Sequence, residues 1–470
     1  MIADLFAGAG GASLGMELAF GRSPDIALNH DELALEMHQE NHPECWHIEE
    51  DALKFGPDEF PIFDKDVNVM WMSPDCRHFS RAKGKRPVSK KIRSLAWAGV
   101  KWARIKRPKI IFLENVAEFL QWGPLHPDGT VVQEKKGLTF KIWLGRLRGL
   151  GYDVDWRVLN CADYGAPTSR KRLFLIARCD GNPIVWPEAT HGPGRPQPWR
   201  TAAECIDWSI GAASIFRRPE AKLRPLAEKT KQRIAHGIMR HVVNDPNPYI
   251  APINGADVSA FFVPRYGERP TQAPRSRDIR RPMPVIVPTQ NGAQLVTAFM
   301  AKHFGGMVGR SLETPVSTIK SRDSQGIVAA NLTKFYGTSK HGAPITNPMP
   351  TVTAQGQHTG LVTAFLTKYY SSGGQLSRAD LPMHTITTKG RMAMVACKVA
   401  GEDYVITDIG MRMLKPHELA MAQGFPSTYK FLGTDTQKIA KIGNSVPPPV
   451  VEALVRANIE GTSIQLLEAA

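Results

Sequence analysis

The sequence predicts an α/β fold, in which a doubly wound sheet of short apolar strands carries an inserted, mostly β domain. The first observation is that short apolar runs, such as 67–72 and 110–113, alternate with helical patterns over the first 180 residues. The second is a change of composition after Pro183, where proline, glycine, threonine and basic residues dominate and long helical patterns become scarce. Helical character returns at 414–423. We therefore expect a nucleotide-type domain at 1–185, an inserted domain at 186–405, and a segment at 406–470 that returns to the first domain.

The charge of the chain indicates a polyanionic partner. The 470 residues carry a formal charge of +15, and the pI is near 9.5. Nucleic acid is the first candidate for such a partner. A generally basic protein without such a partner is the alternative. The cations concentrate in a few segments, however, which favours a binding surface; the segments are 77–109, 135–148, 170–178 and 265–281. Hydrophobic residues make up 42% of the chain, enough for a proper core.

The cysteines and the absence of long apolar runs narrow the class further. Six cysteines stand at positions 45, 76, 161, 179, 205 and 397, and no pair of them has metal-ligand spacing. We therefore expect neither a metal site nor a disulfide framework. No signal peptide precedes the first strand pattern, and no apolar run approaches the roughly 18 residues that a membrane span needs. We expect a reduced, cytoplasmic protein that does not enter the membrane.

The first strand leads into a glycine-rich turn. The apolar run 2–6 breaks into Ala7-Gly8-Ala9-Gly10-Gly11, and a helical pattern follows to Gly21. Strand, glycine loop and helix form the opening of a nucleotide-type fold, in which free N–H groups at the helix start face a ligand. A tight turn alone also needs glycine. The G-x-G-G spacing differs from the G-x-G-x-x-G of dinucleotide sites, so an adenosine cofactor without a pyrophosphate fits better.

Two acids lie at strand ends near this loop. Asp31 follows the second strand pattern, and Asp51 follows a further short strand. Carboxylates at these places suit ribose hydroxyls or an adenine amino group. Each acid taken alone is more often a helix cap, so the two are supporting candidates for a cofactor site.

Cys76 is the candidate nucleophile. It follows the apolar run 67–72 at a turn marked by Pro74, and eight cations come next between residues 77 and 93. Positive charge favours the thiolate, which is the reactive form of cysteine. A buried structural cysteine is the alternative and has even odds on local sequence alone.

Three further candidates stand at strand ends. Glu114 closes the buried strand 110–113, at the edge where open α/β sheets bind ligands. Arg170 and Arg172 enter the strand that follows residue 169. A solvated strand end is the alternative for the arginines, but their place beside the other strand ends favours contact with an anion or substrate.

The inserted region contains weak internal repeats. The segments at 259–267, 297–305, 329–337 and 363–371 resemble one another at a spacing of 32 to 38 residues. Segments of the Pro-Val-Ser-Thr kind fall between them, at 315–318, 350–353 and 384–387. The pattern predicts short β-hairpin modules. They are either purely structural or, as the recurring basic and aromatic residues favour, used for contact with nucleic acid.

The ordered blocks together resemble the DNA (cytosine-5) methyltransferase family. The resemblance covers residues 1–180 and 410–460. It comprises the loop at 4–11, Ser73-Pro74-Asp75-Cys76, Glu114-Asn115-Val116, Arg170-Lys171-Arg172 and Gly443-Asn444-Ser445-Val446. Asp75 stands between Pro74 and Cys76 where the family has Pro-Cys, and Thr168 stands where it usually has glutamine. The acid that holds the cofactor ribose in the family aligns with His30, which leaves Asp31 as the candidate.

The resemblance implies a Rossmann-like sheet of the S-adenosylmethionine-dependent methyltransferases, with the inserted domain as the target-recognition domain. It implies that the Cys76 thiolate adds to carbon 6 of cytosine, that Glu114 assists at N3, and that Arg172, with Arg170 as a weaker candidate, orients the base. The phenylalanine of the loop would pack on the adenine. The implied cofactor residues are Phe6, Ala7, Gly8, Gly10, Gly11, Asp31, Asp51, Asn444 and Ser445.

The implied substrate is a cytosine flipped out of double-stranded DNA by a monomeric enzyme, with a cognate restriction endonuclease as a further partner. A tRNA cytosine-5 methyltransferase is the nearest alternative, but the region of about 220 residues between the blocks favours DNA. An inactive DNA-binding relative is a second alternative, suggested by Asp75. The glycine spacing and the charge disfavour a dinucleotide oxidoreductase.

Overall fold

The computed structural model describes most of the chain. The described residues are 1–58, 66–76, 79, 93–216, 222–253, 256–264, 275–284, 293–303, 402–462 and 464, with short strand segments between 331 and 399. They form two compact units. The first comprises Met1–Ile206, Arg281–Gln290 and Lys415–Ala470, and the second comprises Asp207–Arg280 and Asn291–Leu414. The sequence led us to expect boundaries at 185 and 406 and a C-terminal segment that returns to the first domain. The first unit instead extends to Ile206, its C-terminal segment starts at Lys415, and Arg281–Gln290 also belongs to it.

A seven-stranded sheet forms the centre of the first unit. Its strands are β1 (Ile2–Leu5), β2 (Ile26–Asn29), β3 (Trp46–Glu49), β4 (Val69–Met72), β5 (Ile110–Asn115), β6 (Asp153–Asn160) and β7 (Lys171–Arg178). The order is β3-β2-β1-β4-β5-β7-β6, with β7 antiparallel to both neighbours and the other pairs parallel. This confirms the predicted Rossmann-like sheet. The strand order reverses between β1 and β4, which is the place where open α/β sheets bind ligands.

The described α-helices of the first unit are α1 (Gly11–Phe20), α2 (Glu32–Asn41), α4 (Trp97–Ile105), α5 (Leu138–Gly149), α7 (Pro416–Gln423), α8 (Asp435–Asn444) and α9 (Pro448–Ile459). Helices α4 and α5 pack on one face of the sheet, and α1 and α9 pack on the other. The helix expected from the prolines to residue 459 is confirmed as α9. Helix α8 was not expected, and residues 441–444 belong to its last turn. It begins at a capping box in which the backbone N–H of Thr434 donates to Gln437 Oε1.

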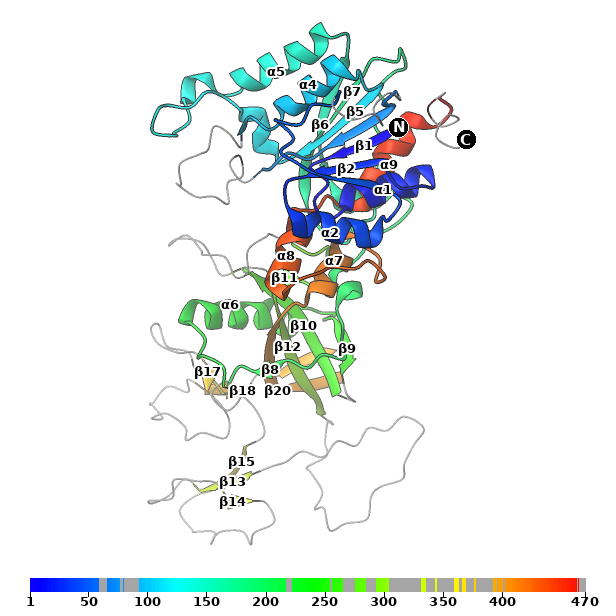
Figure 1. Ribbon diagram of the computed structural model, residues 1–470. Coiled ribbons are helices and arrows are strands. Elements are labelled where there is room, and N and C mark those ends of the chain that lie inside the picture. Colours follow the sequence, from blue (N-terminus) through cyan, green and yellow to red (C-terminus); the bar gives the residue numbers. More distant parts are fainter. Residues whose placement is uncertain are drawn as a thin grey trace. The chain divides into compact units, whose positions relative to one another are not determined.

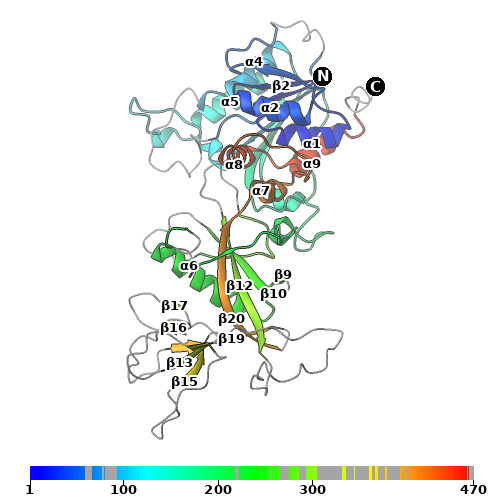
Figure 2. The same cartoon turned by 60° about the horizontal axis from the view of Figure 1, so that its bottom comes forward.

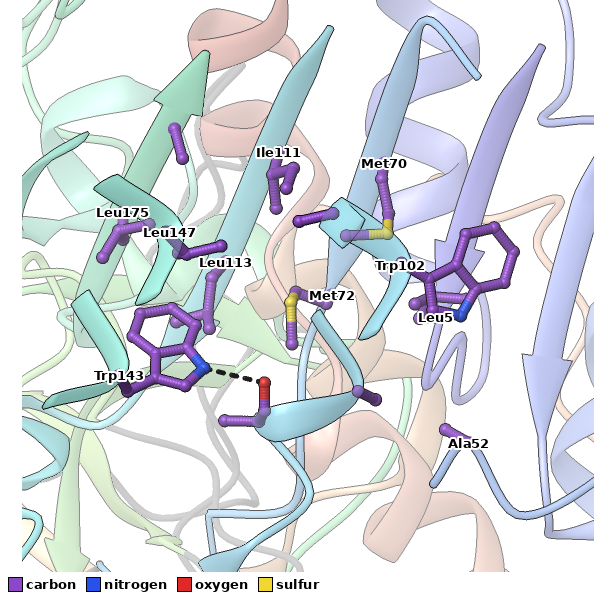
Figure 3. Packing of buried hydrophobic residues seen from close by; sticks show 14 of the residues in the cluster. Leu5, Ala52, Met70, Met72, Trp102, Ile111, Leu113, Trp143, Leu147 and Leu175 are labelled. Carbon is purple, nitrogen blue, oxygen red and sulfur yellow. Dashed lines mark hydrogen bonds between the residues drawn. The ribbon is translucent and has the colours of Figure 1, made fainter. Parts of the chain in front are cut away.

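Alternation along β4 distributes side chains between the two faces. Met70 and Met72 lie in the hydrophobic cluster that includes Trp102 of α4 and Trp143 of α5. Figure 3 shows this cluster, with the Trp143 indole N–H donating to the carbonyl of residue 96 over 2.9 Å. Val69 and Trp71 belong to the other cluster, with residues of α1 and α9. A period of two along a strand produces this division, and both faces are buried as in parallel sheets.

Helices α1 and α9 lie side by side although they come from opposite ends of the chain (Figure 1 and Figure 2). A Cβ on Gly15 of α1 would lie 2.4 Å from Val451 Cβ of α9, so the helices meet backbone to side chain. This contact fixes the C-terminal segment against the first α-helix, and it explains how residues 443–446 reach the glycine loop.

The second unit is mostly β, as predicted. Its main sheet has the order β11 (Arg277–Asp278), β10 (Ala256–Pro264), β12 (Ala293–His303), β20 (Glu402–Met413), β19 (Ala396–Val399), with β9 (Ile250–Ile253) and β8 (Ala213–Ser214) paired to it. Helix α6 (Glu228–Ile238) packs on β10, and Gly237 allows a close approach to Phe261.

Each of the four sequence repeats overlaps a strand. The strands are β10, β12, β13 (Asn331–Lys334) and β16 (Leu366–Lys368). β10 pairs with β12, β13 pairs with β14 (Ala343–Pro344) and β15 (Thr359–Val362), and β16 pairs with β17 (Leu376–Ser377) and β18 (Met392–Met394). The intervening segments at 315–318, 350–353 and 384–387 lie outside the described residues. Within the described residues, no helix is long and apolar enough to cross a membrane.

Candidate active site

A cavity of about 460 Å³ opens at the point where the strand order of the first unit reverses. Its walls come from the loops after β1 and β4, the end of β2, the end of β5, the start of β7 and one face of α8. Ten of the thirteen predicted site residues line it: Phe6, Ala7, Gly8, Gly11, Asp31, Cys76, Glu114, Arg170, Asn444 and Ser445. Gly10, Asp51 and Arg172 do not line it.

Phe6 has an unusual backbone conformation at the wall of this cavity. Its φ is +67°, a region that bulky side chains rarely adopt. The N–H groups of Phe6 and Ala7 both donate to the carbonyl oxygen of Leu28, over 2.9 and 3.1 Å, and hold the loop in place. Such a conformation costs on the order of 1–3 kcal/mol and is typical of functional sites. This strain supports a ligand-facing role for Phe6.

The glycines of the loop accommodate other parts of the protein. A Cβ on Gly11 would lie 2.3 Å from the backbone oxygen of Val446. A Cβ on Gly10, where φ is +84°, would lie 2.1 Å from the hydroxyl of Tyr429. That hydroxyl donates to the carbonyl of Ala9 over 2.8 Å. Gly10 and Gly11 are therefore required by the C-terminal segment, and Gly10 faces away from the cavity.

One face of α8 forms a wall of the cavity that sequence reasoning missed. Gln437, Ala440, Lys441 and Asn444 all line it, and their spacing of three and four residues places them on one side of a helix. Lys441 forms an ion pair with Asp31. The spacing of residues 437, 440, 441 and 444 fits one face of a helix and could have indicated this wall. The sequence instead led us to expect a helix that starts at residue 444.

The two acids at strand ends have different surroundings. The Asp31 carboxylate caps α2 by accepting from the N–H of Ala34 over 3.0 Å. Although partial burial acts to raise its pKa, the hydrogen bonds from Lys441 and Ala34 hold the pKa below its usual value. The Asp51 carboxylate accepts from the backbone N–H of Leu53 over 3.1 Å and lies outside the cavity lining. Asp31 thus acts as a helix cap, which was the alternative explanation for both acids. It also lines the cavity.

The loop that carries Cys76 is fixed by β1 and β5. The N–H of Ser73 donates to the carbonyl of Leu5 over 3.2 Å. The side-chain amide of Asn115, at the end of β5, donates to the carbonyl of Pro74 over 3.0 Å. Asn115 is fully buried, so this bond is protected from water. Asn115 belongs to the Glu114-Asn115-Val116 block, for which only Glu114 has an expected role.

The charged groups described around Cys76 act on the pKa of its thiol in both directions. Burial raises the pKa of the half-buried Cys76 thiol, and the charges of Glu114 and Asp75 act in the same direction. The cations that lower it are Arg172 and Arg170. The expectation that the basic run after Cys76 favours the thiolate concerns cations that, apart from Arg93, lie outside the described residues, so it stays a prediction. Of that run only Arg93 is described, and its guanidinium lies 4.9 Å from the ring centre of Phe79.

Glu114 lies between two arginines at the cavity. Its Oε1 atom is 3.1 Å from Arg172 Nε and 3.7 Å from Arg170 Nη2. Arg170 is only 2% exposed and donates from Nη1 to the carbonyl of Gly443 over 2.8 Å. Burial and the neighbouring Arg172 lower the pKa of Arg170 to about 10. Arg170 thus joins the start of β7 to the end of α8 and lines the cavity, whereas Arg172 makes the shorter contact with Glu114.

The fold and this site define a Rossmann-like α/β protein with a ligand cavity at the strand-order reversal and a cysteine, a glutamate and an arginine in its wall. Residues 1–201 and 318–460 match the model of the C-5 cytosine-specific DNA methylase family. The chain belongs to this family.

Individual relatives match a part of the chain. The Type II methyltransferase M.XorII of Xanthomonas oryzae pv. oryzae is 33% identical over 194 residues, which are 40% of this chain and 42% of that protein. M1.HphI of Haemophilus parahaemolyticus is 30% identical over 192 residues, or 40% of this chain and 48% of that protein. The chain thus spans less than half the length of these curated relatives. A solved structure of DNMT2 from Spodoptera frugiperda aligns over 97% of this chain and 98% of its own, with a TM-score of 0.47 and 12% identity.

Proposed function

We propose that this protein transfers a methyl group from S-adenosylmethionine to carbon 5 of a cytosine in double-stranded DNA. The observation that carries the proposal is the cavity, because Cys76, Glu114 and Arg170 share its wall with the loop that follows β1. A nucleophile, an acid and a cofactor loop within one cavity provide what a covalent methyl transfer to a ring carbon needs.

The residues present fit the cofactor. The strained Phe6 supplies an aromatic face at the cavity wall, and Asn29 and Asp31 supply polar groups at the end of β2. Asn444 and Ser445 supply further polar groups from the opposite wall. Bound S-adenosylmethionine would supply an electrophilic methyl group on its sulfonium. The volume of about 460 Å³ lies within the range typical of small-molecule sites.

Cys76 would activate the cytosine. Carbon 5 is a poor nucleophile, but an electron pair from the Cys76 thiolate forms a bond to carbon 6 and moves the ring π electrons toward carbon 5. Carbon 5 would then take the methyl group, and the electron pair of the broken methyl–sulfur bond would remain on the sulfur of the methyl donor. Loss of the carbon 5 proton to solvent and cleavage of the carbon–sulfur bond restore the aromatic ring and return the thiolate.

Glu114 and the two arginines would hold the base during this sequence. A carboxyl at N3 relieves the negative charge that addition at carbon 6 places on the ring. Arg172 and Arg170 fix the Glu114 side chain through the contacts described above. Carbon 6 is inaccessible within a duplex, so the cytosine must leave the helix to reach the cavity.

The net charge of +15 and the β-rich second unit support DNA as the substrate. We assign target recognition to this unit. Because the relatives named above are Type II methyltransferases, a cognate restriction endonuclease is the partner that we propose.

The test is methyl transfer from labelled S-adenosylmethionine to a mixed-sequence DNA duplex and, in parallel, to tRNA. We expect label in DNA as 5-methylcytosine, located by bisulfite sequencing, and none in tRNA. Label in tRNA alone would replace DNA as the substrate. Cys76→Ser should abolish transfer and retain cofactor binding, whereas the matched variant Cys205→Ser, a buried thiol outside the cavity, should keep both.

DNA that contains 5-fluorocytosine at the methylated position distinguishes covalent from non-covalent transfer. Fluorine cannot leave as a proton does, so the adduct with Cys76 should persist in denaturing electrophoresis. A protein that methylates DNA but forms no adduct would refute the role of Cys76. Absence of both transfer and adduct would favour an inactive DNA-binding relative.

A further inference from the structure

Three potential metal ligands meet on the side of α2 and β3, away from the cavity. His38 comes from α2, His47 lies on β3, and Cys45 stands just before that strand. One ligand atom from each lies within 4.8 Å of the others. His38 and Cys45 are buried and His47 is half-buried. None of the three lines the cavity described above, so the proposed methyl transfer does not use them.

One ring nitrogen of His38 lies opposite one ring nitrogen of His47. His38 Nδ1 lies 2.8 Å from His47 Nε2. On its other side, His38 Nε2 lies 2.8 Å from Ser13 Oγ, which donates to Asp4 Oδ2 over 2.7 Å. Because the single serine proton is used toward Asp4, Nε2 of His38 is the donor in this chain. His38 Nδ1 therefore directs a lone pair at His47.

This arrangement is typical of a metal-binding histidine. Such a histidine usually donates its second ring N–H to a carboxylate or to a group bound to one, which fixes the tautomer and the ring orientation. Ser13 and Asp4 provide this support for His38.

Cys45 supplies the third donor at the same place. Its thiol is buried, and its sulfur lies within 4.8 Å of a ring nitrogen of each histidine. A bound cation would deprotonate this thiol, because coordination favours the thiolate.

We propose that His38, Cys45 and His47 form a structural binding site for a zinc-like divalent cation. Two imidazole nitrogens and one thiolate are borderline-soft donors that suit Zn²⁺ or Co²⁺ and not Mg²⁺ or Ca²⁺. The metal would join the edge strand β3 to α2 and, through Ser13, to the start of α1 behind the glycine loop.

The cysteine positions predict no metal site, because no pair of cysteines has metal-ligand spacing. The three ligands follow the spacing His-x6-Cys-x-His, with one cysteine only. His38 lies close to Cys45 and His47 because α2 packs against β3. A search for pairs of cysteines at metal-ligand spacing cannot detect this arrangement.

The test is a titration of the purified, full-length, chelator-treated protein with Co²⁺, followed by Zn²⁺. We expect one equivalent of Co²⁺ to produce a thiolate-to-cobalt charge-transfer band and tetrahedral ligand-field bands, and Zn²⁺ to remove both. Zn²⁺ should also raise the thermal unfolding midpoint of the protein.

Variants identify the ligands. Cys45→Ser should lose the charge-transfer band and the Zn²⁺-dependent shift of the midpoint, and His47→Gln should bind Co²⁺ at least tenfold more weakly. Cys76→Ser and Cys205→Ser should keep the band, which excludes these two thiols as its source. Far-ultraviolet circular dichroism of the metal-free proteins checks that the folds match. Because His47 is half-buried, His47→Gln remains informative if Cys45→Ser does not fold.

The absence of a charge-transfer band in the wild-type protein would overturn the proposal and leave a pair of histidines that share a proton. A band that survives Cys45→Ser would overturn it as well. Neither result depends on methyl transfer, so the metal site and the proposed function fail separately.

Discussion

Replacing Gly11 by alanine tests how the C-terminal segment completes the cavity. Gly11 is the first residue of α1, and its added Cβ would lie 2.3 Å from the backbone oxygen of Val446. Phe425 Cζ and Ser445 Cβ would each lie 3.2 Å away. The Val446 oxygen belongs to the backbone, so no rotamer change relieves this contact.

The magnitude follows from these distances. Ordinary contact begins at 3.4 Å, so the backbone near Val446 must move by about 1.1 Å. Overpacking of a well-packed core costs about 1–3 kcal/mol, and we expect the free energy of unfolding to fall by that amount. Asn444 and Ser445 would move with Val446, and the dissociation constant of S-adenosylmethionine should rise at least about tenfold, which corresponds to about 1.4 kcal/mol.

The assay is isothermal titration with S-adenosylmethionine, together with urea unfolding of Gly11→Ala and wild type. Gly145→Ala is the matched control, because a Cβ at this position in α5 meets nothing within 4 Å. Alanine there should stabilise the helix by up to about 1 kcal/mol and leave cofactor binding unchanged. Unchanged affinity and stability in Gly11→Ala would refute the contact between Val446 and the glycine loop.

Three further predictions concern the cavity wall. Asp75→Asn should lower the pKa of Cys76 and speed its alkylation by iodoacetamide near pH 7.5, since the Asp75 charge raises that pKa and alkylation consumes the thiolate. Asn115→Ala should remove the bond to Pro74, destabilise the protein by about 1–3 kcal/mol in urea unfolding because a buried carbonyl loses its donor, and lower the methylation rate. Phe6→Ala should weaken S-adenosylmethionine binding in the titration more than it changes the unfolding midpoint, because this half-buried ring faces the cavity.

Each of these predictions has a result that contradicts it. Alkylation is followed at the peptide level by mass spectrometry, with Cys179 as the internal reference thiol, and an unchanged rate for Asp75→Asn would remove the electrostatic role. Asn115→Asp, which keeps the size but loses the amide donor, should behave like the alanine variant. If it behaves like wild type, the bond to Pro74 is unimportant. A Phe6→Ala protein with wild-type affinity would exclude contact between the ring and the cofactor.

Local sequence determined much of the sheet and the residues at its edge. The pattern from residue 2 to Gly21 predicted β1, its loop and α1, because strand, glycine turn and helix each leave a short-range periodicity. Cys76 and Glu114 could be placed at strand ends for the same reason. Since parallel strands of a doubly wound sheet end at one edge, these residues were expected to meet, and the cavity brings them together.

Tertiary structure decided what surrounds those residues. The hydroxyl of Tyr429 meets the carbonyl of Ala9 across 420 positions, and Lys441 meets Asp31 from a helix that local patterns did not reveal. The direction in which the Cys76 pKa shifts depends on burial and on Glu114, Arg170 and Arg172. These contacts cannot be inferred from the cations that follow Cys76 in the sequence. Periodicity records only which face of an element is apolar. The partner that covers that face, and the charges that it brings, follow from packing between distant segments.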